Sequence, residues 1–301
     1  MGFKKTITPI YESFLSLEGR IFPTLRSRCL YKKMVGKKLN LKTPTTLNEK
    51  LMYYKLNLYW NNDLVNRCTD KYTVRSFVEE QGLGKILNPI YGVWERFDDI
   101  DFDKLPNQFV LKLNTGSGCN IVCKDKQSFD KEDAKKKFKK WLKKKYGFLT
   151  AEQGIYSKAK RLIIAEKYID SHNNLPPDDY KFFCSYGDVK LMFAACDRYE
   201  HKTKFDFYTP DWKWIDVKNC HPNAGPKPKP KNYELMVEYA SILSKNFPLV
   251  RIDFYDIDGE VVFGEITFTH MGCVHSFDPD SFDKEFGDLF PSVKDANKIK
   301  S

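Results

Sequence analysis

Two acidic residues near the C-terminal end of the chain, Asp253 and Glu265, have the chemistry and the spacing of a metal site. They lie in the segment 250–273, VRIDFYDIDGEVVFGEITFTHMGC, in which apolar and polar residues alternate on both sides of the turn sequence DIDG. This pattern predicts a β-hairpin that places the two carboxylates on adjacent strands. Paired carboxylate oxygens are hard ligands of the kind that hold Mg²⁺ against phosphate groups. The alternative is a solvated hairpin whose acids face water, where most acidic side chains lie.

A glycine-rich loop supplies a second set of groups that could bind phosphate. The segment 108–124, QFVLKLNTGSGCNIVCK, predicts an apolar strand carrying Lys112, then a loop, then a second strand. Glycines let backbone N–H groups approach phosphate oxygens, and a lysine adds a positive charge. This is not a Walker loop, because no G-K-[ST] sequence follows and no helix begins there. A plain hairpin is the alternative.

The segments around these two candidates predict the elements that position them. Residues 47–56 form a helical pattern with Thr45 or Thr46 as its cap, and a second helical pattern covers 63–80. Residues 163–170, IIAEKYID, predict a buried strand that ends in polar groups. A further helix over 233–245 leads directly into the C-terminal hairpin. We therefore predict a mixed α/β (α+β) protein.

Positive charge is concentrated in one predicted helix. The chain of 301 residues has a net charge of +10, and Lys131 to Lys145 holds nine lysines against two acids. Apolar residues recur within it at helical spacing, which predicts an amphipathic helix with a lysine face. Such a face is either a solvated surface or a dock for a polyacidic glycan, a lipid-linked intermediate or the membrane surface. No nucleic-acid-binding motif accompanies it, so we expect no nucleic acid partner.

The cysteines and the hydropathy pattern set the expected environment. Eight cysteines occur without a C-x-x-C pair, which predicts free thiols. His270, Cys273 and His275 lie close together, but they fall short of a four-ligand zinc site. No apolar run reaches the roughly 18 residues of a membrane span, and no apolar signal core follows the N-terminus. We expect a cytoplasmic protein, with the lysine helix as a further expected contact to the inner face of the membrane.

The order of these segments resembles the ATP-grasp superfamily, and specifically its TupA-like branch, named for teichuronopeptide synthesis and found among capsule and surface-polysaccharide enzymes. The resemblance covers roughly residues 40–280. It is carried by LNEKLMYYKL (47–56), DKYTVR (70–75), the strand and glycine loop (105–126), IIAEKYID (163–170), PDDYKFF (177–183), DR (197–198) and the C-terminal hairpin. The resemblance implies an ATP-grasp fold, with the nucleotide held between two subdomains. The expected division is a helical N-terminal extension (1–60), an N-terminal α/β subdomain (61–105), a flap subdomain with the lysine helix (106–170) and a C-terminal metal-binding, catalytic subdomain (171–301).

The resemblance also implies a nucleotide site. The implied phosphate contacts are Lys71, Lys112 and the loop residues Asn114, Thr115, Gly116, Ser117 and Gly118. The implied adenine slot consists of Glu166, the backbone of Lys167, and Ile169, with Asp170 on the ribose.

The remaining implied roles concern the metal and the reacting groups. Asp253, Glu265 and Thr267 would hold Mg²⁺, Arg251 would stabilise the transferring phosphoryl group, and Lys181 and Arg198 would face phosphate or the acid substrate. The family pattern at the second metal position is Glu-x-Asn, whereas this chain has Thr267 in place of the Asn. A threonine hydroxyl is a weaker ligand, so both one and two metals remain open.

The function expected from these parts is ATP-dependent ligation. Transfer of the γ-phosphoryl group to a carboxylate gives an acyl phosphate, which an amine then displaces to form an amide. The implied substrates are an amino acid or related amine and an acidic sugar, a uronate that is polymeric, lipid-linked or nucleotide-linked. A glycosyltransferase of polysaccharide synthesis is the alternative, although the letters Asp256-x-Asp258 fall in a predicted turn. A binding protein with a decayed site, for which Thr267 argues, is a third interpretation.

Overall fold

The computed structural model describes residues 9–143, 147, 149–170, 176–198 and 202–298. The helices are α1 (Pro9–Ile21), α2 (Pro23–Val35), α3 (Leu47–Leu56), α4 (Asp63–Thr69), α5 (Val74–Glu80), α6 (Lys131–Lys143), α7 (Tyr233–Ser244), α8 (Phe282–Asp288) and α9 (Val293–Lys298), with 3₁₀ turns η1 (Gly84–Ile86), η2 (Phe97–Asp99), η3 (Phe102–Lys104) and η4 (His270–Cys273). The strands are β1 (Ile90–Trp94), β2 (Phe109–Leu113), β3 (Asn120–Cys123), β4 (Ile163–Lys167), β5 (Asp179–Ser185), β6 (Asp188–Cys196), β7 (Lys204–Tyr208), β8 (Trp214–Ile215), β9 (Val250–Ile257) and β10 (Glu260–Thr267).

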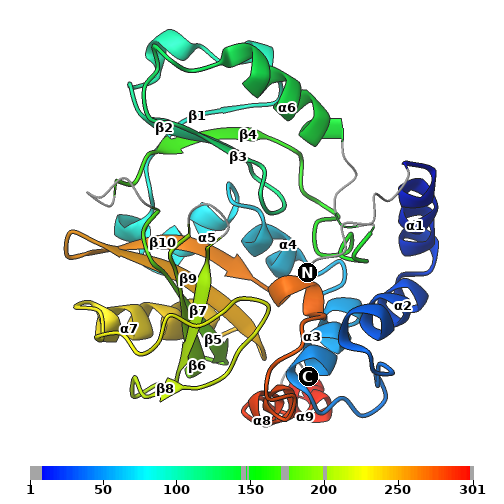
Figure 1. Ribbon diagram of the computed structural model, residues 1–301. Coiled ribbons are helices and arrows are strands. Elements are labelled where there is room, and N and C mark those ends of the chain that lie inside the picture. The colour runs from blue at the N-terminus through cyan, green and yellow to red at the C-terminus, as the bar shows by residue number, and fades with distance from the viewer. Residues whose placement is uncertain (1–8, 144–146, 148, 171–175, 199–201, 299–301) are drawn as a thin grey trace.

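The strands form two antiparallel sheets. The smaller sheet has the order β1-β4-β2-β3, and the larger has the order β10-β9-β5-β6-β7-β8. Figure 1 shows the smaller sheet above the larger one, with α6 on the far side of the smaller sheet. Helices and antiparallel sheets are thus combined in one chain, and the predicted α+β class is confirmed.

The alternation along β2 decides which residues face the larger sheet. Phe109, Leu111 and Leu113 are buried in a core that also contains Phe138 of α6. Because successive side chains of a strand point to opposite faces, Lys112 lies on the face away from α6. The lysine face of α6 is therefore separated from that side by the sheet itself. Lys144 and Lys145, the end of the predicted basic segment, lie outside the described residues.

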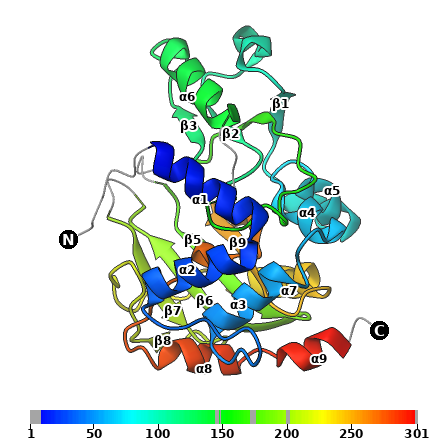
Figure 2. The ribbon, with the colours of Figure 1, turned by 90° about the vertical axis from the view of Figure 1, so that its right-hand side faces the viewer.

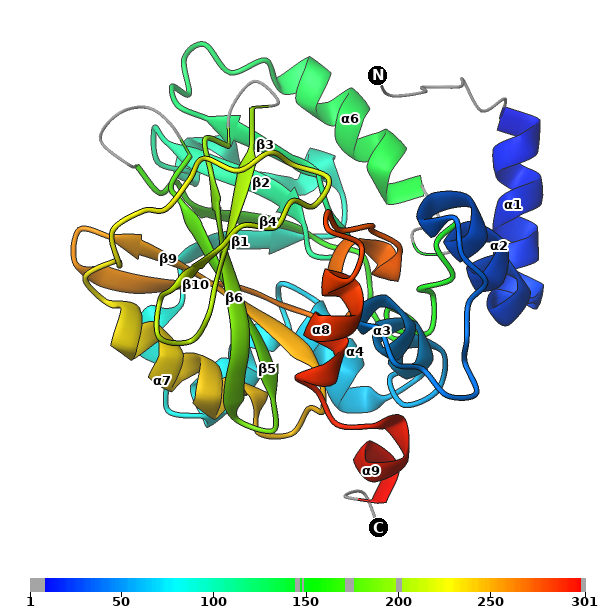
Figure 3. The ribbon, with the colours of Figure 1, turned by 60° about the horizontal axis from the view of Figure 1, so that its bottom comes forward.

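The larger sheet is covered by helices from both ends of the chain. α7 packs on β5, β6 and β9, and α8 packs on α3. Figure 3 shows α8 beside α3, with α9 beyond it. Lys50 of α3 is buried there and donates hydrogen bonds to the carbonyl oxygens of Gly287 and Phe290, both at 2.8 Å. The N-terminal helices are in this way joined to the C-terminal part of the fold.

The helix predicted over 47–56 is confirmed as α3. Thr46 caps it, and Thr46 and Glu49 form a capping box in which each side chain accepts from the other's backbone N–H. The predicted helix over 63–80 is wrong, because it is two helices with a break between them. Asp70 ends α4, and its carboxylate accepts from the backbone N–H groups of Tyr72 and Thr73. The break holds Lys71 out of both helices.

The two sheets do not follow the division expected along the chain. β1 lies within the expected 61–105 subdomain, yet it pairs with β4 in the smaller sheet. A boundary at residue 105 therefore passes through one continuous sheet. The physical reason is that β1 and β4 pair across a long stretch of sequence, which local patterns do not reveal.

The first two helices form a layer on the outside of the molecule. α1 packs on α2, and Gln153 fixes α1 by donating to the carbonyl oxygen of Gly19 at 2.5 Å. Arg26 of α2 donates to the carbonyl oxygen of Leu149 at 2.9 Å. Figure 2 shows both helices across the front of the molecule, below α6.

Candidate active site

The hairpin of β9 and β10 brings the two predicted acids together. Asp253 and Glu265 are directly opposite each other in the strand register, next to a bulge between Phe263 and Glu265. Gly264 occupies the bulge, and a Cβ there would lie 3.0 Å from the carbonyl oxygen of Asp253. A side chain at this position would have to push the backbone of Asp253 away, so glycine permits the close approach of the two strands.

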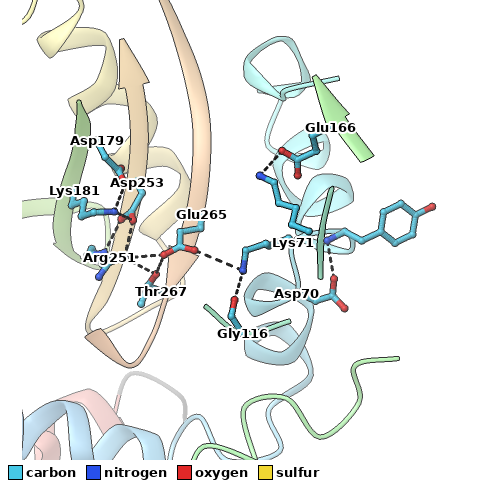
Figure 4. A network of polar contacts seen from close by, with 12 residues as sticks. Asp70, Lys71, Gly116, Glu166, Asp179, Lys181, Arg251, Asp253, Glu265 and Thr267 are labelled. Atoms are coloured by element: carbon cyan, nitrogen blue, oxygen red, sulfur yellow. Dashed lines mark hydrogen bonds and ion pairs between the residues drawn. The ribbon is translucent and has the colours of Figure 1, made fainter. Parts of the chain in front are cut away.

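Arg251 connects these acids. Its guanidinium donates to both carboxylate oxygens of Asp253 at 2.7 Å and to Glu265 Oε1 at 2.9 Å. The hydroxyl of Thr267 accepts from Arg251 at 3.0 Å and donates to Glu265 Oε1 at 2.9 Å. Figure 4 shows this cluster on the left, with Asp253 above the arginine and Glu265 to its right. The solvated hairpin is excluded for Asp253, which is only 1% exposed.

The neighbouring strand adds a second cation and a third carboxylate. Lys181 of β5 is paired in register with Asp253 and bonds to its carboxylate. Lys181 also lies 2.6 Å from Asp179, and Arg198 lies 3.4 Å from the same carboxylate oxygen of Asp179. Lys181 is thus an ammonium group held between two buried carboxylates. Asp179 lies in the sequence motif PDDYKFF, but the motif by itself predicts no role for this carboxylate.

The smaller sheet and the segment after α4 contribute two further lysines. Lys112 of β2 pairs with Glu166 of β4 at 2.6 Å. Lys71 donates to the carbonyl oxygen of Gly116 at 2.7 Å and lies 4.0 Å from Glu265 Oε2. Figure 4 shows Lys71 between the glycine loop and Glu265. Lys71 is therefore where the glycine loop meets the β9–β10 hairpin.

The start of the glycine loop is held by buried hydrogen bonds. The amide of Asn114 donates to Asp70 at 2.5 Å and to the carbonyl oxygen of Lys160 at 2.8 Å, and accepts from the N–H of Leu162. Thr115 is also buried, whereas Gly116 and Gly118 have positive φ angles that favour glycine. In this structure Asn114 is an anchor of the loop, because its side-chain groups are already bonded within the protein.

A cavity of about 350 Å³ lies at the meeting point of these groups. Of the predicted site residues, those that line it are Lys71, Lys112, Gly116, Ser117, Gly118, Lys181, Arg198, Arg251, Asp253 and Glu265. Those outside its lining are Asn114, Thr115, Glu166, Lys167, Ile169, Asp170 and Thr267. Around Lys167, the N–H donates to Pro89 and the carbonyl oxygen accepts from Asn88, so both backbone groups are bonded within the protein.

Two buried polar atoms on the wall of this cavity have no hydrogen-bond partner among the described residues. One is Asp179 Oδ1, an acceptor, and the other is His270 Nε2. His270 Nδ1 lies 2.7 Å from Arg251 Nη1, and because a guanidinium only donates, Nδ1 accepts and the ring proton is assigned to Nε2. Unpaired buried polar groups are costly, so they mark positions that a polar ligand can satisfy.

Charge and burial set the protonation of two groups at the site. Burial raises the pKa of Glu265, but Lys71 and Arg251 outweigh this and bring the pKa down to about 2. Burial and the adjacent Arg251 lower the pKa of His270 well below its usual range. Near neutral pH Glu265 is therefore an anion, and His270 is a neutral donor.

A second cavity, of about 530 Å³, lies on the other side of the Lys71–Glu265 pair. It shares Lys71, Arg251 and Glu265 with the first and also contains Thr267. Its far wall contains apolar side chains of α2 and the carboxylate of Glu152. Glu152 is 7% exposed, and its carboxylate accepts from the hydroxyl of Thr150 at 2.5 Å. No ion pair of Glu152 occurs in the ranges that the structure describes, and no sequence pattern predicts a role for this residue.

Other predicted sites are not formed. No cluster of three His, Cys, Asp or Glu side chains suited to a metal occurs within the described residues, so the zinc hypothesis at His270 has no support. Asp256 accepts from the backbone and amide of Asn232, just before α7, and Asp258 lies in the hairpin turn. The letters Asp256-x-Asp258 thus have structural roles. No residue of α6 lines either cavity.

Comparison with known proteins identifies the family. A family model described as TupA-like ATPgrasp matches residues 49–291. The chain belongs to the TupA-like ATP-grasp family. The TupA-like match begins within α3, so α1 and α2 precede it. A comparison with curated proteins found no match.

Solved structures that are similar to this TupA-like chain include three ligases. They are an L-amino acid ligase from Bacillus licheniformis (TM-score 0.44, 16% identity, 73% of this chain and 47% of that one), a D-alanine–D-alanine ligase from Bacillus anthracis in complex with ATP (0.39, 16%, 67% and 54%) and a D-alanine–D-alanine ligase from Helicobacter pylori (0.41, 16%, 75% and 60%). The chain thus spans about half to three fifths of their length. The assignment to the TupA-like family rests on the match to the family model.

Proposed function

We propose that this chain is an ATP-dependent carboxylate–amine ligase that acts through an acyl phosphate. The observation that carries the proposal is the meeting of Lys71, Lys112, Lys181, Arg198 and Arg251 with an ionised Glu265 around one cavity. Phosphoryl transfer needs positioning and charge neutralisation more than covalent help from the protein. The five cations come from both sheets and from the break between α4 and α5. They would position a triphosphate and neutralise its charge.

The donor set fits a divalent cation. Glu265 Oε1 already accepts from Arg251 and Thr267, but Oε2 has only the Lys71 ammonium at 4.0 Å among the described residues. Asp253 Oδ1 accepts a single hydrogen bond from Arg251 Nε, which leaves it a further lone pair. Glu265, with Asp253, would hold Mg²⁺, and Thr267 is already used as both donor and acceptor. Bound there, Mg²⁺ would neutralise the charge of the phosphates and polarise the transferring group.

The residues of the chain divide the remaining work. Lys71 bonds to the glycine loop and Lys112 lies on the strand that leads into it, and both would bind the phosphates. An oxygen of the acid substrate attacks the γ-phosphorus, and the bond to the ADP oxygen breaks. Arg251 would stabilise the negative charge on the transferring group. The amine then attacks the acyl carbon, phosphate leaves, and the amine nitrogen loses a proton.

The amine substrate would bind in the second cavity. It touches Arg251 and Glu265, so a molecule within it reaches the same reacting groups as the nucleotide. Glu152, which is buried and has no ion pair with any described residue, would hold the ammonium group of that substrate, because a buried carboxylate is stabilised by a cation. Glu152 would also accept the proton that the ammonium group loses when the amine is released to react.

The substrates that we propose are an amino acid or related amine and a uronic acid of a capsular or surface polysaccharide. The family resemblance supports the uronic acid, and the carboxylate of Glu152 in the wall of the second cavity supports the amine. We further propose that the enzyme acts in the cytoplasm, where ATP is available. No observation in the structure favours a glycosyltransferase.

The test is ADP release in the presence of Mg²⁺-ATP, a mixture of amino acids and a panel of uronates and other carboxylic acids. Hydroxylamine added in place of the amine should trap the acyl phosphate as a hydroxamate. ADP with a hydroxamate or amide product supports the proposal. Sugar transfer without ATP consumption would overturn it.

A further inference from the structure

The outer faces of α1 and α2 expose a cluster of large apolar side chains. Of the ten such side chains exposed on the described surface, six lie between residues 14 and 34. Five of them are 51–63% exposed, namely Phe14, Leu17, Ile21, Phe22 and Leu25. We call these five residues the apolar stripe.

The orientation of these helices is fixed by contacts on their other face. Leu15 is buried, and Gly19 and Arg26 bond to residues 153 and 149. The stripe therefore faces outward because the opposite face is the one that docks on the protein. A monomeric protein rarely leaves a contiguous apolar surface without a use for it.

Positive charge is concentrated in the same segment as the stripe. Residues 14–38 contain seven cations against the single acid Glu18, which gives a net charge of +6. Six of these cations are exposed, namely Arg20, Arg28, Lys32, Lys33, Lys37 and Lys38, of which Lys37 forms an ion pair with Asp280. The lysine helix is thus not the only concentration of basic charge in the chain. Apolar side chains beside basic ones are the two signals that hold a helix at an anionic bilayer surface.

We propose that α1 and α2 dock this protein on the surface of an anionic lipid bilayer, with the apolar stripe inserted among the lipids. A second copy of the chain is disfavoured as the occupant, because a symmetric contact would bring two patches of charge +6 together. An anionic surface complements that charge. The helices lie in the plane of the surface, since no described helix is long and apolar enough to cross a membrane.

The docking places the second cavity beside the lipid surface. Leu30 and Met34 of α2 line that cavity, so the helix that contacts lipid also forms the cavity wall. If the proposed ligase activity holds, this arrangement presents a lipid-linked substrate to the site. That last point rests on the proposed function, whereas the docking itself does not.

Cosedimentation of the full chain with lipid vesicles tests the docking without any assay of activity. The protein should bind vesicles that contain phosphatidylglycerol, bind vesicles of phosphatidylcholine alone far more weakly, and lose affinity as salt rises. Leu17→Glu with Ile21→Glu should lower the partition coefficient by about tenfold or more, since both an apolar contact and charge complementarity are lost. Leu289→Glu, at an exposed leucine far along the chain in sequence, is the matched control and should bind as the wild type does.

If the double variant does not fold, insertion of the apolar stripe can be measured in a second way, by tryptophan fluorescence. Phe22→Trp should show extra fluorescence quenching by brominated lipids, relative to the wild-type protein. Three results would overturn the proposal: binding unchanged in the double variant, binding lost only when Lys136, Lys140 and Lys143 of α6 are changed to Gln, or a dimer in light scattering that the double variant dissociates without any vesicle binding.

Discussion

Asp253→Asn and Glu265→Gln should behave differently, although both acids lie in the same hairpin. Asp253 is 1% exposed and accepts hydrogen bonds from Arg251 and Lys181, whose side chains are themselves only 8% and 11% exposed. Removing one partner of a buried ion pair costs about 3–5 kcal/mol, because the other charge stays buried. Asp179 and Glu265 remain near the two cations, so we expect the lower end, about 3 kcal/mol.

Glu265 has a more exposed carboxylate, with 38% of its side chain accessible. Its low pKa reflects favourable contacts with cations, but solvent screens them, and exposed ion pairs contribute about 0–1 kcal/mol. Glu265→Gln should therefore abolish ADP formation and lower the free energy of unfolding by no more than about 1 kcal/mol. Asp253→Asn should abolish ADP formation and also lower the melting temperature by roughly 6–12 °C, at about 2–4 °C per kcal/mol.

The assay combines thermal melting, followed by circular dichroism, with titration of Mg²⁺-ATP. Asp63→Asn is the matched control, because Asp63 is an exposed acid paired with Lys158. It should change stability by less than about 0.5 kcal/mol. If Asp253→Asn melted at the wild-type temperature, the buried ion cluster would not hold Arg251 and Lys181 in solution, and our account of the site would be refuted.

Substitution of Lys112, Glu152 or His270 tests other parts of the site. Lys112→Met should weaken Mg²⁺-ATP binding about 10- to 100-fold in calorimetry, as expected for a lost charge-assisted contact of about 1.5–3 kcal/mol, and unchanged affinity would remove Lys112 from the nucleotide site. Glu152→Gln should raise KM for the amine by about tenfold while KM for ATP stays constant, since a contact to the ammonium group of about 1.4 kcal/mol or more is lost; a parallel rise in both KM values would contradict this. His270 has a lowered pKa in the folded state, so the unfolded chain takes up its proton first and stability falls as pH drops below about 6.5. His270→Gln should remove up to about 1.4 kcal/mol of that loss per pH unit in urea melts between pH 6.5 and 5.5, and an identical pH dependence in both proteins would show that His270 is protonated when folded.

Local sequence patterns were sufficient for the hairpin and for several other helices and strands. Alternation around the DIDG turn predicted β9 and β10, and the register places Asp253 opposite Glu265 as that hairpin requires. The sequence offered Thr45 or Thr46 as the cap of this helix, and Thr46 is the cap of α3, because capping is local in sequence. These successes concern interactions between residues that are close along the chain.

The parts that sequence did not reveal depend on distant contacts. Asp179 and Lys181 lie on the same strand and Arg198 follows the adjacent β6, but this group reaches Asp253 only because β5 lies beside β9. Glu152 becomes a cavity wall only because α2 packs near it. The break at Asp70 has a local cause in its bonds to Tyr72 and Thr73, whereas the bond from Asn114 of the glycine loop to the same carboxylate is a distant contact. The lysine pattern predicted the amphipathic helix α6, but only the sheet topology shows that this helix lies away from both cavities.

The central claim is that the cavity activates a carboxylate by phosphorylation, and the fate of the carboxylate oxygens tests it most directly. The wild-type protein is incubated with Mg²⁺-ATP, an amine and an acid substrate labelled with ¹⁸O in its carboxyl group, and the released phosphate is examined by ³¹P NMR. An acyl phosphate transfers one labelled oxygen to phosphate when the amine displaces it, so we predict singly labelled phosphate in step with ADP. Unlabelled phosphate formed together with ADP would contradict the account.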